Sequence, residues 1–420
     1  MSYQCATTTF TRNVTVAAGD LAPGHLGELT RHAPFELVDA VIAETNTAGR
    51  RRRHLPSRVG MYFLLALALF PGLGYLHVWE KLCAGLSALH PYQPSEKALR
   101  DLRRRLGAAP LKTLFEALAG FLAQPSTPGT HYRRWRTVAF DGCSSIRAAD
   151  RPRILERLRK TRHRWGEAGY PTLQLLTLVE TGTRGLLGAA FGSTSAGELA
   201  YATRLLPLLS PAMLLLVDRG FDSADFFTDI AATGAHLLAR LRSERRPAVL
   251  AVLPDGSYLT RLGTLKVRII EGNITVTTSD GQCLTESYRL ATTLLDHRAD
   301  PADAMIRLYH ERWEIESAYY ALRHTLMTGC VLRSQDLLGW NRNCGPCWPH
   351  ISSFVGRWLR PSSRPPAWIR TEAASPWHSK PLALSSSWPT AYWTIARPSS
   401  AARCSARSSR HVGPASAPAR

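Results

Sequence analysis

Acidic residues are scarce in this sequence, and it has no hydrophobic run long enough to cross a bilayer. Its 420 residues include 32 Asp and Glu against 52 Lys and Arg, which gives a formal charge of +20 and a pI near 10.1. The longest apolar run, residues 61–70, stops at Pro71-Gly72 and has about half the length of a membrane span. These features predict a soluble protein with a polyanionic partner, nucleic acid first.

Paired cysteines and a secretion signal are also missing. The eight cysteines are scattered without a regular spacing, which is typical of a reducing compartment. The first thirty residues contain no apolar stretch followed by a small-residue cleavage site. We therefore expect a cytoplasmic protein.

The positive charge is spread over two parts of the chain. Residues 340–420 contain eleven Lys and Arg and a single acid, Glu372. The other half of the excess, +10, lies in residues 1–339. A nucleic-acid partner is therefore indicated even if the basic tail is set aside.

Helical patterns follow a loose N-terminus, residues 1–24. Over residues 25–122 apolar residues recur with helical spacing, and residues 61–70 predict a buried helix. In the last of these helices Ser95 is a candidate N-cap, and Leu99, Leu102 and Leu106 form one apolar face. The remainder of that helix is basic, which predicts either a DNA-contacting helix or a solvated face. We expect residues 25–122 to form a helical DNA-binding domain.

An α/β pattern replaces the helices in residues 130–242. Short β runs are predicted at residues 137–140, 173–180, 186–191, 213–217 and 236–241, with helices at 195–209 and 223–233. Two of these runs end at Asp141 and Asp218, and functional groups gather at the carboxyl ends of strands in open α/β sheets. Residues 243–296 carry β signals only, with turns expected at Asp255-Gly256, Gly272-Asn273 and Asp280-Gly281.

A long helix is predicted within residues 297–339, with Asp300 as N-cap and Pro301 at its first position. At about 100° per residue, one narrow sector contains Tyr309, Arg312, Glu316, Tyr320 and Arg323. A neighbouring sector is expected to be buried and contains Ala304, Leu308, Ile315, Ala318, Leu322 and Leu326. The polar sector is either a solvated face of ion pairs or a functional edge.

Three carboxylates, Asp141, Asp218 and Glu316, stand out in this order. Taken singly, each has an ordinary explanation as a turn aspartate or an exposed helical glutamate. Taken together, they are hard oxygen ligands that suit Mg²⁺ or Mn²⁺, which would also relieve the repulsion between the carboxylates. Two such ions roughly 3.5–4 Å apart would activate an attacking water or hydroxyl and stabilise the leaving oxygen of a phosphodiester.

These motifs resemble those of the insertion-element-4 family of DDE transposases. The spacing of Tyr309, Arg312, Glu316 and Arg323 is similar to the family's signature, and Asp141-Gly142 and Asp218-Arg219-Gly220-Phe221 resemble its two catalytic aspartate motifs. Residues 25–120 resemble the family's N-terminal domain. The resemblance covers roughly residues 25–339. Arg323 replaces the more usual lysine, but a guanidinium can still hold a phosphate.

The resemblance implies a ribonuclease-H-like α/β fold, a mixed sheet with flanking helices. In it, residues 130–242 would be the first part of the catalytic core, residues 243–296 an all-β insertion, and residues 297–339 the last catalytic helix. It also implies a bacterial enzyme that cleaves and joins double-stranded DNA at inverted-repeat element ends, as a homodimer on that DNA. Asp141, Asp218 and Glu316 would bind two Mg²⁺ (or Mn²⁺) ions, and Tyr309, Arg312 and Arg323 would position the DNA end. Trp313 lies off this sector and is expected to pack.

The composition changes abruptly at Trp340. Residues 340–420 hold seven of the eleven tryptophans and fifteen serines, with no periodicity, and we expect them to be disordered. Residues 340–348 can be encoded by TGG AAC AGG AAT TGT GGG CCC TGC TGG. One added G before this stretch gives Val-Glu-Gln-Glu-Leu-Trp-Ala-Leu-Leu, an amphipathic helix. We therefore interpret the tail as out of frame after a one-base deletion, and we expect it to impair folding or activity.

Three functions remain open from the sequence. The first is a transposase with metal-dependent DNA cleavage and strand transfer. The second is a non-catalytic remnant that still binds element ends. The third is a ribonuclease-H-like nuclease without strand transfer.

Overall fold

The computed structural model describes residues 26–49, 54–84, 91–121, 123, 127, 129–164, 166–183, 185–277, 283–312, 331–332 and 393–396. The chain divides into two compact units. The first unit comprises residues 1–130, 139–208 and 314–369. The second unit comprises residues 131–138, 209–313 and 370–420.

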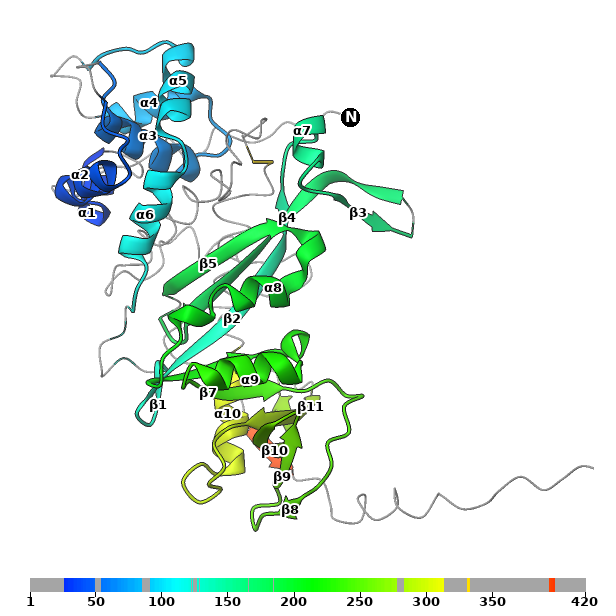
Figure 1. Cartoon of the computed structure of the whole chain (residues 1–420). Helices are drawn as coiled ribbons and strands as arrows, with labels where there is room; N and C mark the ends of the chain where they lie inside the picture. The colour runs from blue at the N-terminus through cyan, green and yellow to red at the C-terminus, as the bar shows by residue number, and fades with distance from the viewer. Residues whose placement is uncertain are drawn as a thin grey trace, which may run out of the picture. The chain divides into compact units, whose positions relative to one another are not determined.

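The first unit starts with a group of helices (Figure 1). Their bounds are α1 Leu26–His32, α2 Phe35–Glu44, α3 Ser57–Leu69, α4 Tyr75–Cys83, α5 Glu96–Leu106 and α6 Ala109–Leu118. Residues 61–68 of α3 are all buried, so the apolar run forms the predicted buried helix. In α5 the Ser95 hydroxyl accepts a hydrogen bond from the Ala98 amide at 3.2 Å, and Leu99, Leu102 and Leu106 are buried. The predicted cap and apolar face of this helix are therefore confirmed.

The arginines of α5 contact other groups of the same helical segment. Arg103 donates to the Tyr75 hydroxyl at 2.8 Å, and Arg105 donates to the Leu55 carbonyl at 2.6 Å. Arg100 and Arg104 form ion pairs within the helix, with Glu96 and Asp101. At least two of the four arginines thus have a structural role that neither sequence interpretation included.

Strands follow the helices in the first unit. β2 Trp135–Arg147 lies next to β4 Gly166–Glu180, which pairs antiparallel with both β3 Lys160–His163 and β5 Leu186–Ser193. The short helices α7 Pro152–Leu155 and α8 Gly197–Thr203 complete this part. The β runs predicted at residues 173–180 and 186–191 lie within β4 and β5. The prediction that a strand ends at Asp141 is wrong, because β2 continues beside β4 for six more residues and Asp141-Gly142 lies within it.

A mixed sheet forms the second unit. Its strands beyond β2 are β6 Met213–Val217, β7 His236–Arg240, β11 Cys283–Thr292, β10 Leu265–Thr277, β9 Tyr258–Leu262 and β8 Ala251–Val252, in that spatial order. β1 His131–Tyr132 pairs with the start of β2. β6 and β7 are parallel, whereas the pairs β7–β11, β11–β10, β10–β9 and β9–β8 are antiparallel. The 3₁₀ turn η4 Arg219–Phe221 and helix α9 Ala224–Ala232 connect β6 to β7, with Ser223 as the N-cap of α9.

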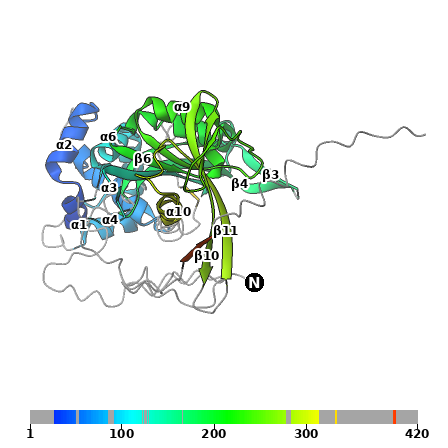
Figure 2. The ribbon, with the colours of Figure 1, turned by 90° about the horizontal axis from the view of Figure 1, so that it is seen from below.

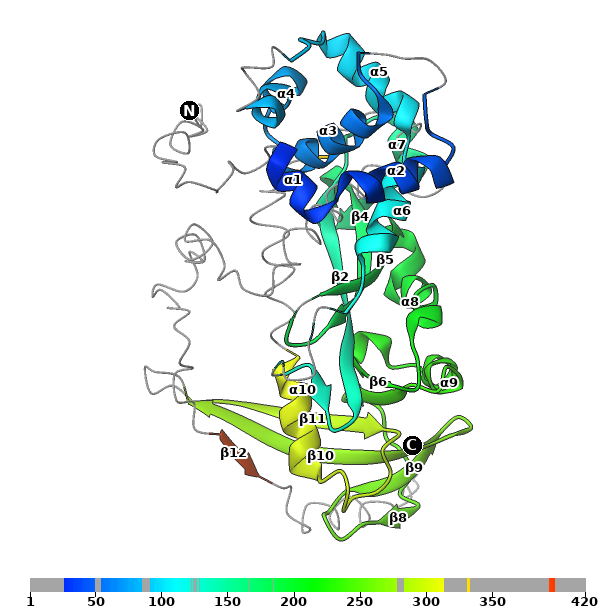
Figure 3. The ribbon, with the colours of Figure 1, turned by 90° about the vertical axis from the view of Figure 1, so that its left-hand side faces the viewer.

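Two helices cover this sheet. Figures 2 and 3 show α9 and α10 Ala302–Glu311 on opposite faces, with α10 lying across β10 and β11. The buried side of α9 consists of Phe226, Phe227 and Ile230, and β6 is buried along its whole length. The expected mixed sheet with flanking helices is therefore present.

Three details of the second unit differ from the predictions. Gly272 and Asn273 do not turn but pair with Tyr288 and Ser287 in the long β10–β11 ribbon. α10 has Pro301, not Asp300, at its N-cap position. The Asp300 carboxylate instead accepts from Tyr132 and Arg133, each at 3.1 Å, so a tertiary contact replaces the local cap.

The described part of the tail is a short strand. β12 Trp393–Ala396 pairs antiparallel with β10, so the expectation of no regular structure does not hold for these four residues (Figure 2). Residues 333–392 and 397–420 lie outside the described residues. None of the helices in the described part of the chain combines the length and the apolar character needed to span a membrane.

Candidate active site

Asp218 lies where the buried strand β6 ends. The five residues of β6 are all apolar and buried, as in a central strand covered on both faces. At Asp218 the chain turns into η4, and the carboxylate caps this turn by accepting from the Arg219 amide at 2.7 Å. The Asp218 side chain remains 39% exposed. The sheet therefore presents a carboxylate at a partly open strand end, as predicted.

Helix α10 brings Tyr309 and Arg312 to this carboxylate. Met305, Ile306 and Leu308 are buried and seat the helix on the sheet. Tyr309 lies one turn after Met305, and its hydroxyl is 3.2 Å from the Val217 carbonyl and 3.4 Å from Asp218 Oδ1. The hydroxyl donates its single proton to one of these two acceptors.

Arg312 approaches the other oxygen of the same carboxylate. Its Nη2 lies 3.7 Å from Asp218 Oδ2, and its guanidinium lies 5.7 Å from the centroid of the Tyr309 ring. The side chain of Arg312 is only 7% exposed, and Tyr309 is 1% exposed. The interpretation of this sector as a solvated face is therefore wrong for both residues.

Burial keeps Tyr309 neutral. Burial raises the pKa of the phenol well above its usual value; the positive charge of Arg312 opposes this effect and the negative charge of Asp218 reinforces it. Tyr309 is consequently a hydrogen-bond donor at any physiological pH. Its proton and the guanidinium of Arg312 both face the Asp218 carboxylate.

Side chains behind Tyr309 complete the packing. The ring of Tyr288 on β11 meets that of Tyr309 edge-on, with centroids 5.6 Å apart. The Tyr288 hydroxyl lies 3.1 Å from His310 Nδ1, and the Arg240 guanidinium stacks 4.7 Å from the Tyr288 centroid. These residues fix the angle at which α10 meets the sheet.

Asp222 is a functional candidate that the sequence interpretation missed. Its carboxylate is 1% exposed, accepts from the Arg242 amide at 2.9 Å and pairs with Arg245 Nε at 2.7 Å. Arg242 also donates to the Arg219 carbonyl at 3.3 Å. Asp222 therefore ties the basic loop after β7 to the turn that carries Asp218. The only sequence signal for this role is its position four residues after Asp218.

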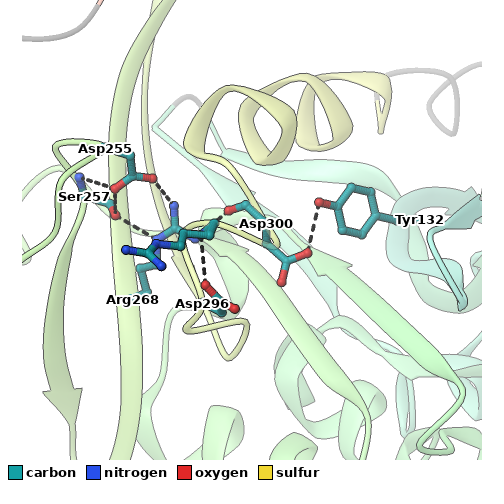
Figure 4. Close-up of polar contacts among 7 residues, drawn as sticks. Tyr132, Asp255, Ser257, Arg268, Asp296 and Asp300 are labelled. Carbon is teal, nitrogen blue, oxygen red and sulfur yellow. Dashed lines mark hydrogen bonds and ion pairs between the residues drawn. The ribbon is translucent and has the colours of Figure 1, made fainter.

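A buried arginine holds the segment before α10 (Figure 4). Arg268 on β10 is 0% exposed, pairs with Asp255, and donates to the Ser257 hydroxyl at 2.7 Å and to the Asp300 carbonyl at 2.6 Å. Because Asp300 directly precedes Pro301 and α10, this contact links strands β8–β11 to the helix that bears Tyr309 and Arg312.

Asp141 lies in the first unit, near the middle of β2. It is partly exposed, and its Oδ1 accepts from the Gly142 amide at 2.9 Å. A Cβ atom at Gly142 would come within 2.7 Å of the Glu198 carboxylate, which in turn accepts from Gln174 Nε2 at 3.1 Å. Glycine at this position therefore leaves space for a second carboxylate beside Asp141.

The remaining predicted site residues, Glu316, Arg323 and Trp313, lie outside the described residues. Among the residues that the structure describes, no three His, Cys, Asp or Glu side chains come together as a metal site. Asp218 and Asp141 nonetheless offer partly exposed carboxylate oxygens, the donor type that hard divalent cations prefer. What the structure brings together is Asp218 with Tyr309 and Arg312.

Two family models match the chain. A model described as insertion element 4 transposase N-terminal matches residues 23–116, and one described as transposase DDE domain matches residues 141–329. The range matched by the second model begins at Asp141 and includes Asp218, Tyr309, Arg312 and Glu316. Together they cover most of the chain before residue 330.

Individual proteins are similar as well. The transposase InsG of insertion sequence element IS4 from Escherichia coli (strain K12) is 26% identical over 313 residues, which cover 71% of this chain and 69% of that protein. A cryo-EM structure of the piggyBac transposase synaptic complex with hairpin DNA aligns over 80% of this chain and 74% of its own, with a TM-score of 0.38 and 11% identity, values too low to bear on the fold. Because both family models match, this chain belongs to the insertion element 4 family of DDE transposases.

Proposed function

We propose that this protein is the transposase of a bacterial insertion sequence, which cleaves DNA at the element ends and transfers the cut strand to a target. The family membership supports the reaction. The observation that carries the assignment to this chain is the Asp218–Tyr309–Arg312 cluster at the end of β6. A buried arginine and a buried tyrosine that meet a partly exposed carboxylate suit a ligand group that must be held in a fixed orientation.

The catalytic residues in this proposal are Asp141, Asp218 and Glu316. They would hold two divalent cations, Mg²⁺ or Mn²⁺, because three carboxylates supply hard oxygen ligands and leave coordination positions open. When bound, the ions supply Lewis-acid activation of the attacking and leaving oxygens. Family members use divalent ions, and the identity and number of the ions are part of the proposal.

The roles of the other residues follow from their contacts. Tyr309 and Arg312 orient the Asp218 carboxylate, which would hold a cation through its remaining oxygen lone pairs. Arg312 and Arg323 would also hold the phosphate of the DNA end, since a guanidinium matches phosphate geometry. Asp222 and Arg242 keep the turn that bears Asp218 in place.

We further propose the domain organisation and assembly that the family implies. Residues 25–122 would bind DNA, residues 130–242 and 297–339 would form a ribonuclease-H-like core, and residues 243–296 would be an all-β insertion. The antiparallel order of β8–β11 supports the last of these assignments. The active assembly would be a homodimer on double-stranded DNA, with the inverted-repeat ends and the target as substrates.

The tail supplies the argument for a second candidate function. If residues 340–420 are read out of frame, the segment that should pack behind the catalytic helix is lost. The product would then bind element ends without cutting them, as a non-catalytic remnant. Nuclease activity without strand transfer is the third outcome.

The test is strand cleavage by the purified protein on the DNA that flanks its own gene, with Mg²⁺ or with EDTA. Cleavage at the inverted repeats followed by joining to a target supports the transposase. Binding without cleavage supports the remnant, and hydrolysis without joining supports the nuclease. A Glu316→Gln variant should abolish cleavage and leave DNA binding nearly intact.

A further inference from the structure

A strongly basic segment lies between β2 and β4 in the first unit. Residues 147–164 contain seven arginines and one lysine against two acids, Asp150 and Glu156. All seven arginines are exposed, and six of them, here called the basic hairpin face, are Arg147, Arg151, Arg153, Arg157, Arg159 and Arg162. The segment runs from the end of β2 through α7 to β3, and Figure 1 shows the β3–β4 hairpin projecting from the end of β4.

The backbone that carries the basic hairpin face is held in place by buried side chains and hydrogen bonds. Ile154 and Leu158 are buried, at 1% and 3% exposure, between the exposed arginines. The Ala148 amide donates to the Pro171 carbonyl at 2.9 Å, and Lys160 forms an ion pair of 2.6 Å with Asp150. Since the backbone is already ordered, a ligand that binds the face does not have to order it, which lowers the entropic cost of binding.

The charges of the face are not neutralised within the described part of the chain. There, Arg147, Arg151, Arg153, Arg157 and Arg159 form no ion pair, and Arg162 has only an exposed contact of 3.9 Å with Glu167. The arginines of α5 differ, because all four contact carboxylates, a hydroxyl or a carbonyl of the same helical segment. A surface evolved for solubility alone would intersperse both signs of charge.

The type of cation and its position both point to a nucleic-acid backbone. Guanidinium groups bind phosphate oxygens in pairs, which lysine cannot do. The face starts at Arg147, six residues after Asp141 on the same strand, and a strand rises about 3.3 Å per residue. Arg147 therefore lies about 20 Å from Asp141, which is the length of about six base pairs at 3.4 Å per step for a duplex that runs along β2.

We propose that the basic hairpin face binds the phosphate backbone of double-stranded DNA about six base pairs from the cleaved phosphate, without reading its sequence. This inference rests on the proposed function for the position of cleavage, though not for the binding itself. The face would hold the duplex that leads away from the active site and so fix the register of the scissile bond.

The first test measures DNA affinity as a function of salt. The full-length protein, Arg153→Gln/Arg157→Gln, and a control, Arg261→Gln/Arg298→Gln, are titrated by fluorescence anisotropy into an element-end duplex and a scrambled duplex. The control removes two exposed arginines from the second unit, so the change in net charge is equal. Each lost phosphate contact reduces the slope of log K against log[salt] by about 0.9. We expect a reduction of about 1.8 for the first variant on both duplexes, and none for the control.

The same slope predicts how the ratio of wild-type affinity to variant affinity changes with salt concentration. Between 50 and 200 mM salt, the advantage of the wild type over Arg153→Gln/Arg157→Gln should shrink about tenfold. An unchanged slope overturns the proposal. An equal reduction in the control also overturns it, because the effect would then come from net charge. A loss confined to the element-end duplex would contradict the absence of sequence reading.

The second test maps the position of the contact. A photoreactive p-benzoylphenylalanine in place of Arg153 should form adducts about six base pairs from the cleaved phosphate. Adducts elsewhere on the duplex, or none, contradict the predicted position. Binding and crosslinking need no catalysis, so they can succeed when cleavage fails. If the protein cleaves DNA but Arg153→Gln/Arg157→Gln leaves the slope of log K against log[salt] unchanged, the proposed function is supported and this inference is wrong.

Discussion

Tyr309 joins two parts of the second unit through a single hydroxyl group. It is buried on α10, and its oxygen reaches both the last carbonyl of β6 and the Asp218 carboxylate. A substitution that removes only the oxygen separates this contact from the packing of the ring against Tyr288.

Tyr309→Phe should cost about 1 kcal/mol of unfolding free energy, since one buried hydrogen bond is lost. It should lower the rate of strand cleavage about 10–100-fold, as expected when a residue that orients a metal ligand is changed. Urea denaturation and cleavage assays measure the two effects. Tyr62→Phe is the matched control, because its buried hydroxyl donates to the Ala33 carbonyl at 2.6 Å in the first unit. Equal cleavage rates in both variants would contradict the role of Tyr309.

His236 makes the stability of the second unit depend on pH. Burial lowers the pKa of its imidazole, and the charge of Arg134 lowers it further, while Asp300 acts in the opposite direction. The unfolded chain therefore takes up the proton first as the pH falls below about 6.5. The stability contributed by neutral His236 is present above that pH and is lost as the pH falls toward the folded-state pKa.

The urea midpoint of the wild type should consequently fall more between pH 7.5 and pH 5.5 than the midpoint of His236→Gln. The glutamine cannot take up a proton in this range. Parallel curves for the two proteins would show that the imidazole titrates equally in the folded and unfolded states.

Sequence reasoning found the site residues that follow a local rule. Asp218 was predicted because an apolar strand stops there, and Tyr309 and Arg312 because helical spacing places them on one edge. Asp222 and Arg268 were missed, since their partners lie 11 to 32 residues away along the chain. Such contacts depend on the tertiary fold, which no local pattern encodes.

At the scale of elements, the same distinction holds. The α5 cap, the buried α3 and the β runs within β4 and β5 follow from local composition and were predicted. Asp141-Gly142 and Gly272-Asn273 have turn-like composition, yet both lie inside long strands. Neighbouring strands there supply partners for the backbone, and this outweighs the local preference for a turn.

Ser95→Ala tests the cap of α5. Removing the hydroxyl that accepts from the Ala98 amide should cost about 1 kcal/mol, whereas Ser95→Asp should retain most of the stability. Thermal or urea unfolding of the first unit measures the difference. If aspartate and alanine destabilise the protein equally, the cap does not contribute.

Arg268→Met tests the link between the β10 strand and α10. It leaves Asp255 without its buried cation and the Asp300 carbonyl without a donor, so it should cost about 3–5 kcal/mol. Arg268→Met/Asp255→Asn should recover part of this loss. The control Arg261→Met, at an exposed position of β9, should change stability by less than about 0.5 kcal/mol. A cost below 1 kcal/mol for Arg268→Met would contradict the role of the buried network.

For the whole molecule, the frame of the tail decides whether the site is supported. We expect the nucleotide sequence to show that one added base before Trp340 restores a helical reading frame. The frame-restored protein should be more stable to urea than this chain, because residues 340–420 could then bury an apolar face. If no single inserted base restores such a frame, the interpretation of the tail is wrong.

The most direct measurement is Mg²⁺-dependent strand cleavage at the element's own ends. It compares this chain, the frame-restored chain and the frame-restored Asp218→Asn variant, with DNA binding measured in parallel. We predict cleavage by the frame-restored protein, impaired cleavage by this chain, and a loss to the level of protein-free DNA in Asp218→Asn with binding retained. Cleavage that persists in Asp218→Asn would show that the carboxylate at the end of β6 is not catalytic.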